Sequence, residues 1–219
     1  MKQLVCLSDI FCFKEKTQRQ TNFILFIIKW IIILLPIVVG TSMGIIYGKK
    51  WDEEKYKNLK KPPLYPPNYL FSIVWPILYI MIGFTYYNIL YKSGCIPYGY
   101  SKCGISIQYV KSLYLIIPTL ALIFNFAYIP VFFSENGLFN GLVVIILALL
   151  FAVLTVIQTI LLDSYKTTVV SKTTMVLFGL VPYIAWLCFA TYLSYNLYVL
   201  NKKEYMFNEN YKNLKSFAK

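Results

Sequence analysis

Three residues near the end of the last apolar run, Tyr183, Trp186 and Ala190, have the types and spacing of a binding surface for a flat molecule. Positions i, i+3 and i+7 of a helix lie on one face. That face presents two aromatic rings and then the gap left by a small side chain. A flat apolar ligand can stack on the rings and fill the gap, although the same face can also simply pack against a neighbouring helix.

Polar side chains inside apolar runs are the next candidates, because each is costly in lipid and tends to face a partner helix or a cavity. Asn125 lies in an aromatic stretch with Phe126 and Tyr128, and Gln158 interrupts the following run. For Asn125 a ligand contact and an interhelical hydrogen bond are both open. For Gln158 the interhelical hydrogen bond is the preferred interpretation.

The composition excludes several kinds of chemistry. The 219 residues include no histidine, which removes the commonest general base, the usual haem ligand and most zinc sites. The five cysteines form no CxxC pair, and only Cys95 and Cys103 share a loop, where a disulfide is left open. We therefore predict no catalytic residue, no metal site and no cofactor.

The most specific stretch of the chain is a charged loop that ends in prolines 62, 63, 66 and 67. Because each proline fixes φ near about −65° and removes a donor, Lys61 to Asn68 is predicted to be a stiff, extended lid. Its free carbonyls exclude it from lipid, so it must lie at a membrane face or over the mouth of a cavity. The neighbouring aromatic residues are typical of an interface: Trp51, Tyr56, Tyr65 and Tyr69. An ordinary connecting loop is the alternative.

The overall composition is that of a membrane protein, with 58% hydrophobic and 14% charged residues and a mean hydropathy of +0.61. The net charge of +12 comes from Lys and Arg placed between the apolar runs and at the chain ends. This pattern matches lipid headgroups, whereas a nucleic-acid groove requires a basic face. Nucleic acid is therefore not an expected partner.

Five apolar runs are each long enough to cross a hydrocarbon core of ~30 Å. They cover residues 23–47, 68–91, 108–133, 138–162 and 173–200. The predicted fold is an all-α membrane protein, a bundle of five transmembrane helices with a proline-rich loop between helices 1 and 2. Its parts are an N-terminal arm (1–22), the transmembrane domain (23–200) and a basic C-terminal tail (201–219).

Helix neighbours and topology follow from the connections between the runs. Residues 134–137 form so short a turn that the third and fourth helices must be antiparallel neighbours. Gly40 and Gly44 form a small-xxx-small pair that lets another helix approach closely. Five crossings place the two termini on opposite sides of the membrane.

Three ordered blocks of residues give the chain a family resemblance. The first combines Trp51, Tyr56, Leu59, Lys61-Pro62, Pro66-Pro67, Val74-Trp75, Leu78-Tyr79 and Gly83; the others are residues 124–133 and 182–191. Over roughly residues 30 to 202 the chain resembles the translocator protein family, also called tryptophan-rich sensory proteins and formerly peripheral-type benzodiazepine receptors.

The resemblance implies a pocket for drugs and porphyrins that includes the asparagine, tryptophan and alanine named above. The predicted ligand-binding residues are Trp51, Tyr65, Asn125, Tyr128, Tyr183, Trp186 and Ala190. A loose cholesterol pattern is matched by Leu193, Tyr198 and Lys202, although an aromatic and a cation at a helix end are also typical of any membrane interface. The resemblance also places the first loop and the C-terminus on the cytosolic face.

Several departures from the family pattern limit what is carried over. Leu64 stands where the lid tryptophan is usual, Tyr128 replaces a later tryptophan, and Val144 replaces an acidic residue. In bacterial relatives the lid tryptophan and the fifth-span tryptophan are associated with porphyrin breakdown, and of that pair only Trp186 is found here. The chain is therefore expected to be a binder rather than an enzyme.

The predicted function is binding of hydrophobic small molecules in a central helical cavity, with transport or sensing of them. The ligands implied are porphyrin or haem, cholesterol or another sterol, and benzodiazepine-type compounds; membrane lipids are further partners. A porphyrin-degrading membrane enzyme is the alternative, and a scaffold that forms a homodimer through its two spaced glycines is a third hypothesis. The N-terminal arm and the richness in Lys, Asn, Tyr and Ile suggest a eukaryotic source, for which the resemblance favours the mitochondrial outer membrane.

Overall fold

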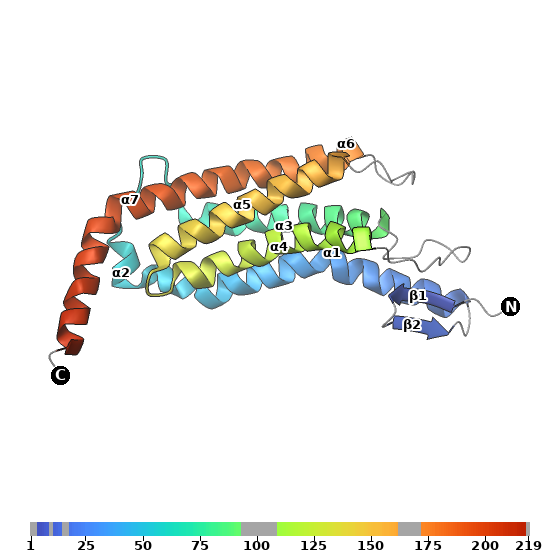
Figure 1. The fold of residues 1–219 in the computed structure, drawn as a ribbon, viewed down its shortest axis with the longest axis horizontal. Helices are drawn as coiled ribbons and strands as arrows, with labels where there is room; N and C mark the ends of the chain where they lie inside the picture. Colours follow the sequence, from blue (N-terminus) through green and yellow to red (C-terminus); the bar gives the residue numbers. More distant parts are fainter. Residues whose placement is uncertain (1–3, 9–10, 15–17, 93–108, 162–171, 218–219) are drawn as a thin grey trace.

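Five long helices make up the structure, a computed structural model that describes residues 4–8, 11–14, 18–92, 109–161 and 172–217. They are α1 (Gln18–Gly48), α3 (Asn68–Lys92), α4 (Tyr109–Phe132), α5 (Gly137–Leu161) and α7 (Val181–Phe217). The helices run along the long axis of the molecule, except for the C-terminal stretch of α7 (red), which turns away from it, and the N- and C-termini lie at opposite ends (Figure 1).

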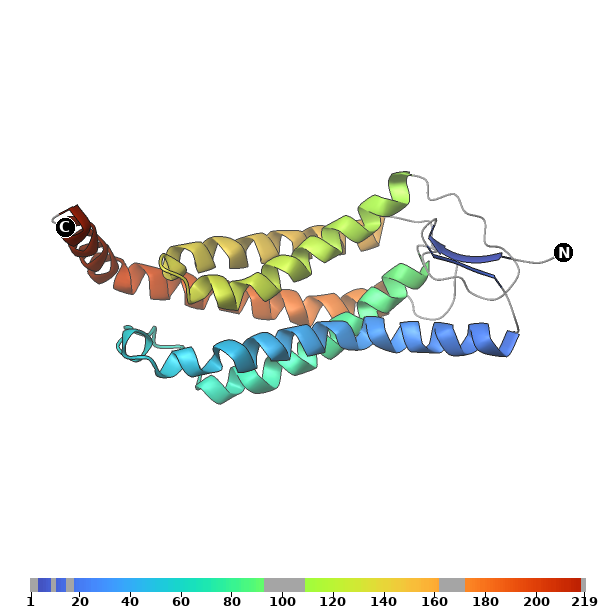
Figure 2. The same cartoon turned by 90° about the horizontal axis from the view of Figure 1, so that it is seen from below.

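The helices pack in two pairs. Figure 2 shows α1 beside α3 and α4 beside α5, with α7 running along the bundle. The pairing of α4 with α5 follows from their connection, because Ser134 N–H donates to Val131 O and Gly137 N–H donates to Ser134 O across the turn. The short turn therefore gives the antiparallel neighbours that the sequence predicts.

Four helices of the described chain are long and apolar enough to cross a membrane. These segments are Phe26–Gly48, Asn68–Asn88, Gly137–Leu161 and Thr173–Lys202, and the apolar part of α4, Ile116–Phe132, is shorter. Their outer faces are rich in exposed large apolar side chains, as a lipid-facing surface requires. The predicted all-α membrane fold is confirmed.

A small antiparallel hairpin precedes the bundle. Strand β1 (Leu4–Ser8) pairs with β2 (Phe11–Lys14), and the register is irregular between Cys6 and Ser8. The sequence predicts only an arm here, with no strands. Strands of five and four residues are too short to give a clear alternation of apolar and polar residues in the sequence. A hairpin of this size also has marginal stability by itself.

Glycines set the closeness of α1 and α3. A Cβ at Gly83 would collide with the carbonyl of Ile33, and one at Gly40 would collide with the ring of Tyr79. Gly44, by contrast, has open space around it. Gly40 and Gly44 form the predicted small-residue pair. The ring of Tyr79 from the same chain packs on Gly40, so only Gly44 lies on an outer face where another helix could approach.

The first loop, residues 49–67, joins α1 to α3 through η1 (Lys49–Asp52) and α2 (Glu54–Lys57). Tyr56 anchors it, because its ring is 4% exposed and lies 4.7 Å from that of Phe133, measured between centroids. The predicted extended lid is wrong in one respect, since Tyr65 N–H donates to Pro62 O and closes a turn. Pro63 occupies the second position of that turn, where a fixed φ favours turning.

One turn of π-helix precedes α7. The short helix α6 (Lys172–Met175) leads into this π-helix, η2 (Val176–Leu180), where Gly179 is pressed against Thr85 of α3. Such a turn widens the helix locally. It thereby shifts the register of the side chains at the start of α7, which include Tyr183.

Candidate functional site

The candidate site is a cluster of four aromatic residues between α3 and α7, formed by Phe71, Trp75, Tyr79 and Trp186, here called the aromatic cluster. The rings of Trp75 and Tyr79 are stacked at 5.4 Å, since the two residues are one helical turn apart on α3. Trp186 reaches them from α7, with its ring 6.3 Å from Trp75 and 5.9 Å from Phe71. Edge-to-face and offset geometries of this kind are the favoured ones for aromatic pairs.

The first loop covers the cluster through Tyr65. The ring of Tyr65 lies 6.0 Å from Phe71, and the Lys61 ammonium lies 5.0 Å from the Tyr65 ring. Burial, with a smaller contribution from Tyr128, raises the pKa of Tyr65 to about 12. The predicted ligand residue Tyr65 is thus a largely desolvated neutral phenol at physiological pH, held beside the cluster.

Two polar contacts border the cluster on the side of α4. The Asn125 amide donates to the hydroxyl of Tyr79 at 3.4 Å, and Asn125 is 4% exposed. One turn further along α4, the Tyr128 hydroxyl is hydrogen-bonded to Ser194 of α7 at 2.8 Å. Of the two roles considered for Asn125, the structure therefore shows the interhelical hydrogen bond, which the Asn125 amide donates to Tyr79 of the aromatic cluster.

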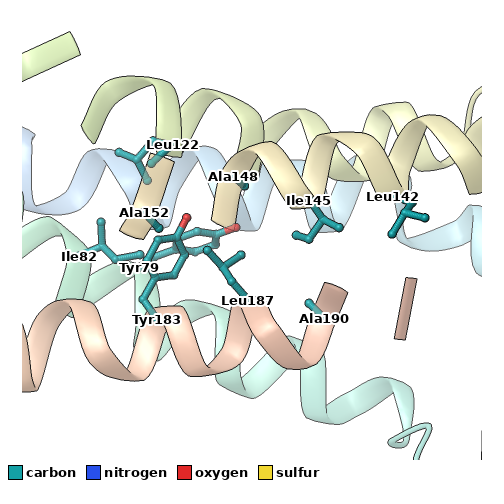
Figure 3. Close-up of a cluster of buried hydrophobic side chains, with 11 residues drawn as sticks. Tyr79, Ile82, Leu122, Leu142, Ile145, Ala148, Ala152, Tyr183, Leu187 and Ala190 are labelled. Carbon is teal, nitrogen blue, oxygen red and sulfur yellow. The ribbon is translucent and has the colours of Figure 1, made fainter. Parts of the chain in front are cut away.

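Tyr183 and Ala190 lie in the packed core, which also contains Tyr79. Figure 3 shows both residues on α7 together with Leu187, on the side that faces α5, with the ring of Tyr183 by that of Tyr79. These α7 residues are all buried, with Tyr183 2% exposed. The face with spacing i, i+4 and i+7 packs on α5, whereas the ring of Trp186 contacts Phe71 and Trp75 of α3. A common binding space for Tyr183, Trp186 and Ala190 stays a prediction.

Two buried donors are available for a ligand. Among the described residues, the hydroxyl of Tyr183 and the indole N–H of Trp186 have no hydrogen-bond partner. Gln158 has an unpartnered buried carbonyl oxygen as well, so the interhelical hydrogen bond preferred for it is not made through that atom. Buried polar groups are normally satisfied, and an unpaired donor beside stacked rings suits a flat ligand that carries an acceptor.

The rings of the aromatic cluster contact one another between α3 and α7. A ligand that stacks on Trp186 must therefore move Phe71 or Trp75 aside, or enter as Tyr65 is lifted. Aromatic rings turn about two side-chain angles, so such a rearrangement needs no movement of the helices. Among the described residues, the acidic and sulfur side chains form no group that could hold a metal ion.

The three residues of the cholesterol pattern differ in exposure. Leu193 is buried in the bundle, Tyr198 is half-buried with its ring 5.6 Å from Phe139, and Lys202 is exposed at the end of the span. A sterol on the lipid face would contact Tyr198 and Lys202 without reaching Leu193. The pattern stays a prediction in this form.

Some predicted residues lie beyond what the structure describes. The side chain of Trp51 is outside the described part, although its backbone belongs to η1. Cys95 and Cys103 lie in residues 93–108, also outside it. The role of Trp51 as a ligand contact and the pairing of the two cysteines therefore stay predictions.

The sequence interpretation missed Phe71, Trp75 and Ser194. The lid position is still occupied by Leu64, as the sequence shows, but a different tryptophan, Trp75 of α3, lies 6.3 Å from Trp186. Trp75 is one of the residues of the first block, and its place four residues before Tyr79 was the available signal. A helix that is apolar all round gives no indication of which face meets its partner.

Comparison of the sequence with known proteins identifies its family. The TspO/MBR family matches residues 32–200. The tryptophan-rich protein TspO of Chlorobaculum tepidum is 32% identical over 78% of this chain and 97% of its own. The translocator protein of Bos taurus is 31% identical over 77% of this chain and 87% of its own, and the translocator protein homolog of Schizosaccharomyces pombe is 28% identical over 78% and 91%.

The bundle of apolar helices defines an integral membrane protein. Because the family match covers most of the chain and the similarity to relatives is nearly full-length, this chain belongs to the TspO/MBR family. The predicted resemblance is confirmed. The family's members carry the names of translocator and tryptophan-rich proteins.

Proposed function

We propose that the protein binds flat hydrophobic molecules at the aromatic cluster beneath the first loop, and that it transports or senses them. The observation that supports this most strongly is the Trp75–Trp186 contact at 6.3 Å, with the indole N–H of Trp186 buried and without a described partner. Two tryptophan faces offer stacking, and the free donor offers a hydrogen bond to an acceptor on the ligand.

Porphyrin or haem is the first ligand class we propose, with sterols and benzodiazepine-type compounds as further ones. A porphyrin has the large flat π-system that stacking requires, and acceptor groups at its rim. Since the chain has no histidine, a bound haem would be held by stacking and not by an imidazole. The name of the bovine relative, translocator protein, agrees with a transport role without naming a cargo.

The membrane and the oligomeric state are proposals of the same kind. We place the protein in the mitochondrial outer membrane, with the first loop and C-terminus cytosolic and lipids as neighbours. Similarity to both a bovine and a bacterial protein supports membrane insertion in general. A homodimer would use the outer face around Gly44, because Tyr79 already covers Gly40.

A titration with protoporphyrin, haem and cholesterol tests the binding site. Protoporphyrin should quench tryptophan fluorescence, and Trp186→Ala should weaken its binding by about 0.5 to 1.5 kcal/mol, the contribution typical of one aromatic pair. Trp30→Ala is the matched control, because Trp30 lies exposed on the outer side of α1. Equal affinities in folded Trp186→Ala and unmodified protein would move the site away from the cluster.

A porphyrin-degrading enzyme is the second candidate, and the Trp75–Trp186 pair is the observation that favours it. If oxygen takes an electron from one indole, the radical cation that remains can be stabilised by the second indole in edge contact with it. As a binder, the protein should return protoporphyrin unchanged after illumination under oxygen. Loss of the porphyrin absorbance in unmodified protein and in Trp30→Phe, but not in Trp75→Phe or Trp186→Phe, would establish the enzyme instead.

A further inference from the structure

The carboxamide of Asn201 forms two hydrogen bonds with the backbone of the first loop at Lys60. The Lys60 N–H donates to Asn201 Oδ1 at 2.9 Å, and Asn201 Nδ2 donates back to the Lys60 carbonyl at 3.0 Å. The same nitrogen also donates to the Leu197 carbonyl of its own helix at 2.8 Å. A primary amide has one acceptor oxygen and two N–H donors, and every one of them is used here. With Asn201 only 4% exposed, the contact is shielded from competing water.

The contact joins the site's cover to the helix that carries the site. Lys60 directly precedes Lys61 and the turn that ends at Tyr65, the residue that covers Phe71. Asn201 lies near the end of the span Thr173–Lys202, fifteen positions beyond Trp186, or about 22 Å along α7 at 1.5 Å per residue. Trp186, which offers the stacking surface, and Asn201, which binds the first loop, therefore both belong to α7.

A second anchor limits which part of the first loop can move. The ring of Tyr56 is buried against Phe132 and Phe133, close to Leu197. Leu59 packs on the same cluster, and the backbone of the next residue, Lys60, is held by hydrogen bonds just before the proline-rich residues 62–67. Two hydrogen bonds at one residue cost less to break than the withdrawal of a buried aromatic ring, so the Lys60 contact is the one expected to open first.

We propose that Asn201 is a positioning residue that holds the first loop closed over the aromatic cluster, and that its release of Lys60 admits a ligand to Trp186. The closing role stands on the hydrogen bonds alone. The admission of a ligand rests on the proposed function, and the two parts are tested separately.

The amide chemistry defines the variants. Asn201→Asp replaces the donor Nδ2 with a second acceptor oxygen, which loses the bonds to the Lys60 and Leu197 carbonyls and repels both. Oδ1 can still accept from the Lys60 N–H, so the amide at position 60 exchanges faster because the repelled loop opens more often. Asn196→Asp is the matched control, since Asn196 is on the same helix and bonds only the carbonyl of Tyr192 in the described structure. Lys60→Ala removes an exposed side chain and keeps the backbone contact, and should behave like unmodified protein.

Hydrogen exchange of the backbone amide at position 60 measures the closing role without any ligand. Mass spectrometry with backbone fragmentation can measure the exchange of the single amides of residues 59 to 61. Because Pro62 and Pro63 carry no amide hydrogen, they add no signal to fragments that end after residue 61. In unmodified protein the Lys60 amide should exchange more slowly than that of Lys61, and Asn201→Asp should speed it by about tenfold or more, as expected for one or two lost hydrogen bonds. Neither Asn196→Asp nor Lys60→Ala should speed it.

The same exchange data can overturn the closing role. Equal exchange at Lys60 and Lys61 in unmodified protein would do so even if Asn201→Asp failed to fold. So would equal acceleration by Asn201→Asp and Asn196→Asp, because that result would mean general loosening of α7.

Stopped-flow quenching by protoporphyrin tests the admission of ligand. Asn201→Asp should raise the association and dissociation rates together, by about tenfold, and change the dissociation constant much less than Trp186→Ala does. Faster exchange at Lys60 with unchanged protoporphyrin rates would overturn the gating part. Absence of protoporphyrin binding by the unmodified protein would count against the proposed function, while the exchange rates would still decide whether Asn201 closes the loop.

Discussion

Tyr65 is the residue through which the first loop reaches the aromatic cluster. Its ring borders Phe71, and its hydroxyl is desolvated near Tyr128. A single side chain thus combines packing, which holds the loop down, with an ionisable group that burial keeps neutral. The loop should therefore respond to pH only in the alkaline range.

We expect the free energy of unfolding to depend on pH through Tyr65. Because burial raises the pKa of Tyr65 from 10.0 to about 12, the contribution of the neutral ring is fully present below pH 10. It is lost as the pH rises toward 12, since the unfolded chain ionises first. Tyr65→Phe should flatten this part of the stability profile, measured by unfolding in detergent at a series of pH values.

Tyr69→Phe is the control for that measurement, because the ring of Tyr69 is 66% exposed at the start of α3. It should retain the alkaline loss of stability seen in the unmodified protein. If Tyr65→Phe retained the whole of that loss as well, the hydroxyl of Tyr65 would not be buried against the aromatic cluster.

At the scale of elements, the close approach of α1 and α3 depends on missing side chains. Gly83 lies against the carbonyl of Ile33, a backbone atom that cannot turn away. Gly40 lies against Tyr79, so the position of that ring in the aromatic cluster also depends on α1. Small residues at such contacts are the usual means by which membrane helices pack closely.

Two alanine substitutions on these helices should change stability in opposite directions. Gly83→Ala should lower the free energy of unfolding by about 1 to 3 kcal/mol, because the new methyl group collides with α1. Gly44→Ala should raise it by about 0.5 to 1 kcal/mol, since the site is open and alanine favours a helix more than glycine does. Unfolding of both variants in the same detergent gives the comparison.

A Gly83→Ala protein as stable as the unmodified one would contradict the packing of α1 on α3. Tryptophan fluorescence gives a second reading, because a displaced α1 changes the surroundings of Tyr79 and its stacked neighbour Trp75. Gly44→Ala should leave that emission unchanged.

At the scale of the whole molecule, the bundle is long and its ends are distinct. The first loop and the C-terminal part of α7 lie at one end, and the N-terminal hairpin lies at the other (Figure 1). The contact of Lys60 with Asn201 ties the loop end together. If all five long helices cross the membrane, we expect the two termini to face different compartments.

Accessibility of tags tests this topology. With epitopes fused at both termini and the protein in sealed membranes, a protease should remove only one of them until detergent is added. The C-terminal tag should share its side with Lys57 and Lys60 of the first loop, detected by labelling of exposed amines. Removal of both tags in sealed membranes would contradict an odd number of crossings.

The sequence by itself determined the membrane class, the helices, the antiparallel α4–α5 turn and the family. Each of these is a local property, because a long apolar run, a four-residue turn and a row of prolines act within a short stretch of chain. The aromatic run around Asn125 was equally readable. The turn at Pro63 was not, since a proline fixes φ and leaves ψ free to close a turn.

Only the tertiary structure decided which side chains meet. It placed Trp75 against Trp186, turned Tyr183 and Ala190 onto α5, covered Gly40 with Tyr79, and joined Asn201 to Lys60 across 141 positions of the chain. Membrane helices are apolar on their lipid face as well as on their packing face, so periodicity does not single out the buried side. Small residues and interhelical hydrogen bonds choose that side, and they act only once the helices are adjacent.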